Sequence, residues 1–146
     1  MIGGCATTIK RARTALTRGK IELMTLYPKE LQPILDKIDP TFGRSIDCDA
    51  GWWPLIEELH EEISEIDPDY RIYQVKQKLG GLRFYFSASN PLLSSTVQQV
   101  VDRYEKLSFT ICEKTGKEGQ LMNKDGQYQT LNQSFMDEGW QKVESF

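Results

Sequence analysis

The chain has 146 residues, of which 39% are hydrophobic and 27% are charged, and its formal net charge is −3. This composition is typical of one globular domain of ordinary size. No apolar run approaches the ~20 residues of a transmembrane helix, and the first residues lack the apolar core of a secretory signal. We therefore expect a cytoplasmic protein with no membrane partner.

The first twenty residues form a basic segment, which we interpret as an N-terminal arm (1–20). They contain five of the eighteen basic residues and none of the twenty-one acidic ones, so residues 21–146 have a net charge of −8. Such an arm is a candidate for contact with nucleic acid, and the alternative is a terminus that only balances an acidic body. Its basic residues are Lys10, Arg11, Arg13, Arg18 and Lys20.

Three helices are predicted from apolar periodicity. The first begins near Pro28 and ends before Pro40. The second extends from Trp52 to about Ile66, and its buried stripe comprises Trp52, Ile56, Leu59, Ile63 and Ile66. The third follows Pro91, and its buried face comprises Val97, Val100, Val101, Tyr104 and Leu107.

Residues 70–87, YRIYQVKQKLGGLRFYFS, predict a β-hairpin between the second and third helices. Gly80 and Gly81 supply the positive φ angles that a two-residue primed turn requires. A turn at these glycines would place Lys78 opposite Arg83. The apolar face would then comprise Tyr73, Val75, Leu79, Leu82, Phe84 and Phe86.

The other face of this hairpin is basic and carries the candidate binding residues. Opposed cations repel each other and favour an anion, so we interpret this face as a site for a phosphate or an acidic partner. The alternative is a solvated face, or one that acidic groups of the same chain neutralise. The candidate residues are Gln74, Lys76, Lys78, Arg83 and Tyr85.

The sequence contains no complete catalytic or metal-binding motif. Glutamates 57, 58, 61, 62 and 65 follow the pattern of a solvated helix face. His60, the only histidine, has no accompanying nucleophile motif, so we interpret it as a partly buried structural side chain. Cys5, Cys48 and Cys112 are odd in number and far apart, which favours free thiols. We predict no catalytic residue, no metal ligand and no cofactor.

The order of three motifs resembles a widespread family of small uncharacterised tailed-phage proteins. The motifs are Tyr27-Pro28, Cys48-Asp49 with Gly51-Trp52, and the segment VKQKLGGLRFY at residues 75–85. The likeness covers residues 27–131. It implies phage origin and residence in the cytoplasm of the host, and it brings no known reaction.

In that family a helix and a zinc-ribbon-like tail, CxxCGxPG with a later cysteine, follow the hairpin. From about residue 111 this chain matches the pattern at Cys112, Gly116 and Gly119, but Thr115 and Asn132 occupy the positions of cysteines. Structural zinc needs four ligands, so we expect a tail without metal that keeps a tight turn and a second short hairpin.

The fold class that these elements predict is α+β, with helices packed on a small antiparallel sheet built around the hairpin at 70–87. Residues 21–146 would form a single domain with the ribbon-like tail at its end. The expected core comprises Trp52, Ile56, Leu59, Phe84, Phe86, Val100 and Tyr104.

For function, we expect a non-enzymatic phage accessory protein that binds, and inhibits or redirects, a host or phage macromolecule through its charged faces. The expected partner is a protein. The first alternative is nucleic acid, bound by the basic hairpin face and the arm. The second alternative is a hydrolase that uses Glu57, Glu61 or His60.

Overall fold

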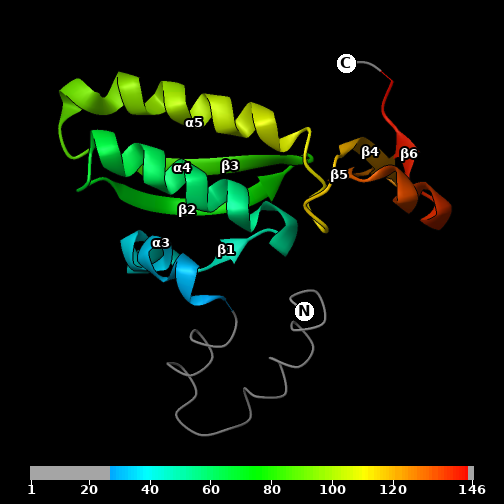
Figure 1. Cartoon of the computed structure of the whole chain (residues 1–146), viewed down its shortest axis with the longest axis horizontal. Helices are drawn as coiled ribbons and strands as arrows, with labels where there is room; N and C mark the ends of the chain where they lie inside the picture. The colour runs from blue at the N-terminus through cyan, green and yellow to red at the C-terminus, as the bar shows by residue number, and fades with distance from the viewer. Residues whose placement is uncertain (1–26, 145–146) are drawn as a thin grey trace, which may run out of the picture.

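The computed structural model describes residues 27–144, so the predicted arm, with Cys5, lies outside the described residues. The fold is α+β (Figure 1). The helices are α3 (Gln32–Lys37), α4 (Trp53–Ile66) and α5 (Ser94–Ser108), and the strands are β1 (Ile46–Asp47), β2 (Arg71–Lys78), β3 (Gly81–Ser87), β4 (Gln120–Lys124), β5 (Gln127–Leu131) and β6 (Gln141–Lys142). Five short 3-10 turns connect them: η1 (Lys29–Leu31), η2 (Pro40–Phe42), η3 (Ala50–Trp52), η4 (Pro91–Leu93) and η5 (Gln133–Glu138).

The three predicted helices form where their apolar periodicity places them. Proline occurs in the first turn of α3 and of α4, where its missing N–H has no helical partner to lose. The prediction for the end of α5 was wrong, because Leu107 is 42% exposed while Ser108 is fully buried. Ser108 is turned toward β3, where its Oγ accepts a hydrogen bond from the backbone N–H of Leu82 at 2.9 Å.

The body of the protein has two layers, with α4 and α5 side by side over one face of a three-stranded sheet (Figure 1). The sheet order is β1-β2-β3, in which β2 and β3 are antiparallel and the two-residue β1 pairs parallel to β2. The helices and the sheet bury one core that includes every residue predicted for it, with Phe86 partly buried at its margin.

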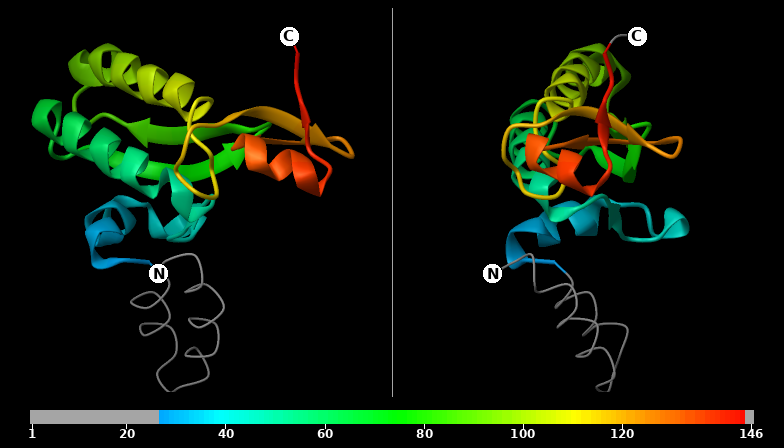
Figure 2. Two further views of the ribbon diagram at one scale, coloured as in Figure 1. Left: turned by 45° about the vertical axis from the view of Figure 1, so that its right-hand side comes forward. Right: turned by 90° about the vertical axis from the view of Figure 1, so that its right-hand side faces the viewer.

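The tail begins after α5 and forms a second small sheet of order β5-β4-β6 (Figure 2). The predicted second hairpin is confirmed, with Asp125 and Gly126 as its turn. A separate apolar cluster holds the tail together, in which Cys112, Met122 and Leu131 are fully buried against Phe135 and Trp140. The tail lies beside the tip of the β2–β3 hairpin, where the Thr130 hydroxyl donates to the carbonyl oxygen of Gly80 at 2.7 Å.

The β2–β3 hairpin turns one residue earlier than predicted. The two turn residues with positive φ are Leu79 (54°) and Gly80 (89°), so Lys78 pairs with Gly81 and Lys76 pairs with Arg83. The predicted opposition of Lys78 and Arg83 is therefore wrong. The face that each residue occupies is largely unchanged, because moving a turn by one position shifts the cross-strand pairing by two residues.

Gly81 is a glycine because of packing and not because of the turn. A Cβ at this position would overlap the ring of Phe109, which covers the start of β3. The glycine pair thus serves two separate needs, since Gly80 allows the reversal of the chain and Gly81 allows the approach of an aromatic ring.

Two residues predicted on the apolar face of the hairpin are exposed, and that part of the prediction was wrong. Leu79 lies in the turn and is 62% exposed. Tyr73 lies at an irregularity in the pairing between Ile72 and Gln74, which places it on the side away from the core. Ile72, which the prediction did not include, is fully buried in its place. A bulge adds one residue to a strand and so breaks the alternation on which the prediction depended.

We predict that Leu79→Asn stabilises the protein. A leucine in the left-handed region costs about 1–2 kcal/mol, and asparagine tolerates this region better, so the free energy of unfolding should rise by about 1 kcal/mol. Urea denaturation measures the change. Leu92→Asn is the control, because Leu92 is 86% exposed and has no positive φ. A Leu79→Asn variant that is no more stable than Leu92→Asn would contradict the argument.

Candidate functional site

The candidate site is the side of β2 and β3 that faces away from α4 and α5, here called the outer face. The alternation of the strands brings all the predicted binding residues together there. The outer face comprises Arg71, Tyr73, Gln74, Lys76 and Lys78 of β2, Arg83 and Tyr85 of β3, Asp47 of β1 and Phe42 of η2.

The cations of the outer face adjoin one another. Lys76 pairs with Arg83 of β3 on one side and with Asp47 of β1 on the other. Asp47 offsets part of the repulsion between the two cations, and Lys78 extends the row toward the hairpin tip. Among residues 27–144 the one ion pair within 4 Å is Glu62–Arg103, so no described carboxylate pairs directly with Lys76, Lys78 or Arg83.

Three exposed aromatic side chains lie among these cations. Phe42 and Tyr73 form an edge-to-face pair with ring centroids 5.5 Å apart. Tyr85 is 42% exposed, and Nζ of Lys76 lies 5.9 Å from its ring centroid. Tyr85 was predicted, whereas Phe42 and Tyr73 were missed. Phe42 belongs to the short 3-10 turn η2, and the bulge that exposes Tyr73 leaves no mark in the sequence pattern.

Side chains of the same chain bond to backbone groups at both edges of the sheet. At β1, the hydroxyl of Tyr27 accepts from the N–H of Ile46 at 3.0 Å and donates to its carbonyl oxygen at 3.5 Å. At β3, Ser108 accepts from the N–H of Leu82, and Oε2 of Glu105 accepts from the N–H of Phe84 at 2.9 Å. A partner strand would have to displace these bonds, so the outer face is more accessible than either edge.

The acidic helix and the histidine take part in contacts within the fold. The Glu62 carboxylate pairs with Arg103 and accepts a hydrogen bond from the Tyr104 hydroxyl at 2.7 Å. Nδ1 of His60 lies 2.7 Å from the hydroxyl oxygen of the fully buried Tyr70. Burial, together with the charge of Lys37, lowers the pKa of His60, so the neutral ring is favoured.

A buried carboxylate joins the tail to the body. Glu113 is 2% exposed, and its side chain accepts hydrogen bonds from the N–H of Asp49 at 3.0 Å and from Nε2 of Gln129 at 3.0 Å. Burial raises the pKa of Glu113, and the two hydrogen bonds offset part of that rise. Burial also raises the pKa of the nearby Cys48 thiol, with a further contribution from the Glu113 charge, which favours an unreactive thiol.

The same junction depends on close contact at Gly51. A Cβ on Gly51 would overlap the carbonyl oxygens of both Cys112 and Glu113. Beside it, Nε1 of Trp52 donates to the carbonyl oxygen of Ile111 at 2.8 Å. The Gly51-Trp52 pair of the sequence motif therefore serves to dock the tail.

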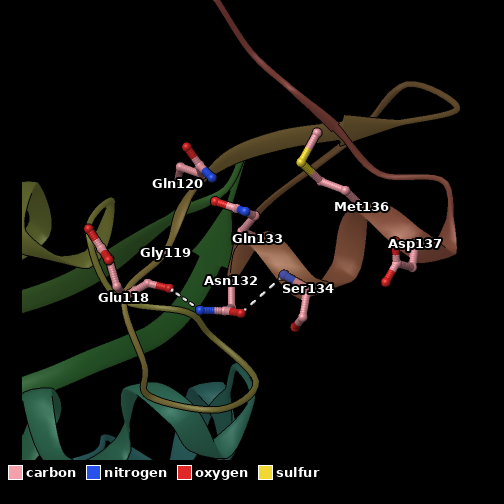
Figure 3. A pocket seen from close by; sticks show the side chains of 8 residues that line it. All are labelled: Glu118, Gly119, Gln120, Asn132, Gln133, Ser134, Met136 and Asp137. Carbon is pink, nitrogen blue, oxygen red and sulfur yellow. Dashed lines mark hydrogen bonds between the residues drawn. The ribbon is translucent and has the colours of Figure 1, made fainter.

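Asn132 links two segments of the tail beside a polar hollow (Figure 3). Its Nδ2 donates to the carbonyl oxygen of Glu118 at 2.9 Å, and its Oδ1 accepts from the N–H of Ser134 at 3.0 Å. The hollow has a volume of about 730 Å³ and is lined by Glu118, Gly119, Gln120, Asn132, Gln133, Ser134, Met136 and Asp137. Asn132 thus supplies a neutral cross-link at a position where the resembled pattern has a cysteine.

The tail residues do not fit a structural zinc site. Cys112 is fully buried within the apolar cluster of the tail, and Thr115 uses its Oγ1 to accept from the N–H of Lys117 at 3.2 Å. Within residues 27–144 there is no group of three or more His, Cys, Asp or Glu side chains placed to hold a metal ion. Cys112 acts here as a small apolar side chain.

No protein-family model, curated protein or solved structure matches this chain. The likeness to tailed-phage proteins therefore stays an expectation from the sequence motifs. Between residues 27 and 144, none of the helices has the length and apolar character needed to span a bilayer.

We predict that Glu113→Gln changes how stability depends on pH. Folding raises the pKa of Glu113, so the folded protein favours the protonated carboxyl. The stability that this protonation provides is complete below the ordinary glutamate pKa and is lost as the pH rises through the pKa of Glu113 in the folded protein. The stability of the variant relative to the wild type should therefore increase from about pH 4 to about pH 8. Urea denaturation at several pH values measures this difference. Glu118→Gln, in an exposed part of the same loop, is the control, and an identical pH dependence in both variants would refute the argument.

We predict that Gly51→Ala destabilises the protein by about 2–3 kcal/mol, because the new methyl group would meet two backbone carbonyl groups that cannot rotate away. Gly43→Ala is the matched control. A Cβ there meets nothing within 4 Å, and only the positive φ of 81° would cost about 1 kcal/mol. Equal losses in the two variants, measured by chemical denaturation, would show that the close contact at Gly51 is not needed.

Proposed function

We propose that this protein is a non-enzymatic binding protein whose outer face engages an anionic macromolecule. The observation that carries the proposal is the accumulation of four cations with a single carboxylate on one sheet face, in a chain whose net charge is −3. Exposed aromatic side chains between the cations add contact area to that face.

The arrangement of the sheet supports this choice of surface. The two long helices cover the face of the sheet opposite the outer face. At the edges, Tyr27 bonds to Ile46 of β1, and Glu105 and Ser108 accept from two N–H groups of β3. Lys76 and Arg83 are kept adjacent although like charges across a strand pair destabilise a sheet. An anion between them would relieve that repulsion and gain from both charges.

The hydrolase alternative has less support. His60 is bound to Tyr70, and Glu62 is bound to Arg103 and Tyr104. Glu57 has a raised pKa, from partial burial and the neighbouring charges of Glu30 and Glu61. In an infected cell, the setting that the phage resemblance implies, binding would inhibit or redirect the partner.

We predict that the purified full-length protein binds to immobilised heparin at low salt despite its net negative charge. The double variant Lys76→Glu with Lys78→Glu should elute at a distinctly lower salt concentration, because it reverses two charges of the outer face. The measurement is the salt concentration at elution.

The double variant Lys106→Glu with Lys117→Glu is the matched control. It has the same net charge and the same N-terminal arm, and both lysines are exposed outside the outer face. Equal shifts in the two double variants would attribute retention to overall charge. No retention of the wild type would refute the proposed function.

A further inference from the structure

We propose that the ligand of the outer face is a single strand of nucleic acid, whose bases stack on Tyr85 and on the Phe42–Tyr73 pair while its phosphates contact Lys76, Lys78 and Arg83. This inference rests on the proposed function and specifies the partner. It adds Phe42 and Tyr73 to the site, and neither residue was apparent from the sequence.

The aromatic side chains support the stacking part of the proposal. Phe42, Tyr73 and Tyr85 are 54%, 36% and 42% exposed, although aromatic rings of this size are more often buried in a core. The ring planes of Phe42 and Tyr73 meet at 72°, so the two rings contact each other edge to face and do not stack on one another. Ring faces therefore remain open to bases, and stacking on such rings does not depend on base identity.

The cations lie where a backbone beside stacked bases would pass. Lys76 and Lys78 are two residues apart on β2, or ~6.8 Å along the strand. Arg83 lies across from Lys76 on β3, and Nζ of Lys76 is within 6 Å of the Tyr85 ring centroid. A cation and an aromatic ring are thus within reach of one nucleotide, as single-strand binding grooves require.

A duplex fits this face less well. The bases of a duplex are already stacked on one another. They could stack on the exposed rings only after the duplex was unpaired. Sequence reading in a groove also needs an element that projects into it, and the outer face is one side of a three-stranded sheet.

An acidic protein is the other macromolecule that such charges would attract. Lysine is depleted in protein–protein interfaces, and the core of such interfaces is poor in charge. Here Lys76 and Arg83 pair across the strands directly beside Tyr85, and Lys78 continues the row toward the hairpin tip. The observations therefore favour phosphates over carboxylates of a folded partner.

Fluorescence anisotropy with a labelled mixed-sequence single-stranded DNA of about twelve nucleotides, its RNA counterpart and the annealed DNA duplex tests the proposal. The full-length protein should bind at least one of the single strands more tightly than the duplex at low salt. Tyr85→Ala should weaken single-strand binding by about 5- to 100-fold and leave the slope of log affinity against log salt unchanged. Leu92→Ala, on an exposed part of η4, should change neither quantity.

The lysines should give the opposite pattern. Replacing Lys76 and Lys78 by Gln removes two phosphate contacts, so the salt slope should become shallower by about 1.4. The Lys106→Gln and Lys117→Gln pair should leave the slope unchanged. A second test is ultraviolet cross-linking of the same oligonucleotide, in which we expect the label on peptides that contain Tyr73 or Tyr85.

The outcomes separate this inference from the proposed function. Retention on heparin through Lys76 and Lys78 without oligonucleotide binding would overturn the nucleic-acid ligand and leave an acidic protein as the partner. Oligonucleotide binding that survives Tyr85→Ala unchanged, or that is lost only when the cations of residues 1–20 are replaced by serine, would overturn the stacking site. Equal affinity for the duplex would do the same.

Discussion

The structure depends on the register of the β2–β3 hairpin, because it assigns every side chain of the central sheet to the core or to the outer face. The turn at Leu79 and Gly80 fixes the pairing. Where β3 begins, the Phe109 ring covers Gly81 and would have to move to accommodate any larger residue there. A slip of one residue in either strand would expose Val75 or Phe84 and bury charged groups. The tail uses the same turn, since Thr130 bonds to the carbonyl oxygen of Gly80. One local reversal of the chain therefore positions the core, the basic face and the tail.

The outer face is a consequence of how the remaining surfaces of the sheet are used. The helices need the inner face for the core, and an open sheet edge invites association with other strands. Here two side chains of α5, Glu105 and Ser108, accept hydrogen bonds from the backbone at the β3 edge. The hydroxyl of Tyr27 does the same at the short β1. Burying the Glu105 carboxyl at that edge raises its pKa, which is the energetic cost of closing it. What remains is the outer face, and the concentration of cations there is the feature that packing does not require.

Local patterns in the sequence were sufficient for the helices, for the two hairpins and for the side of the sheet on which Gln74, Lys76, Lys78, Arg83 and Tyr85 lie. Periodicity reports which face of an element is buried, and it survives a turn displaced by one residue. It could not reveal β1, whose two residues become a strand only by pairing with β2. It could not reveal the bulge at Tyr73, because an extra residue in a strand is defined by the partner strand. Glu113 was missed for a similar reason, since a buried carboxylate is recognisable only by the donors, Asp49 and Gln129, that other segments bring to it.

The tail is a small module, and its described residues include no group of side chains placed to hold a metal ion. A segment of this size buries too little apolar surface to be stable alone, which is why such modules usually carry a metal or disulfides. In this chain Cys112 packs with Met122 and Leu131, and Asn132 cross-links its neighbours by hydrogen bonds. These contacts are weaker than four metal bonds, so the tail must gain stability from the body. The contacts at Gly51, Trp52, Glu113 and Gly80 supply it. Folding of the tail is thereby coupled to the loop before α4 and to the hairpin that presents the outer face.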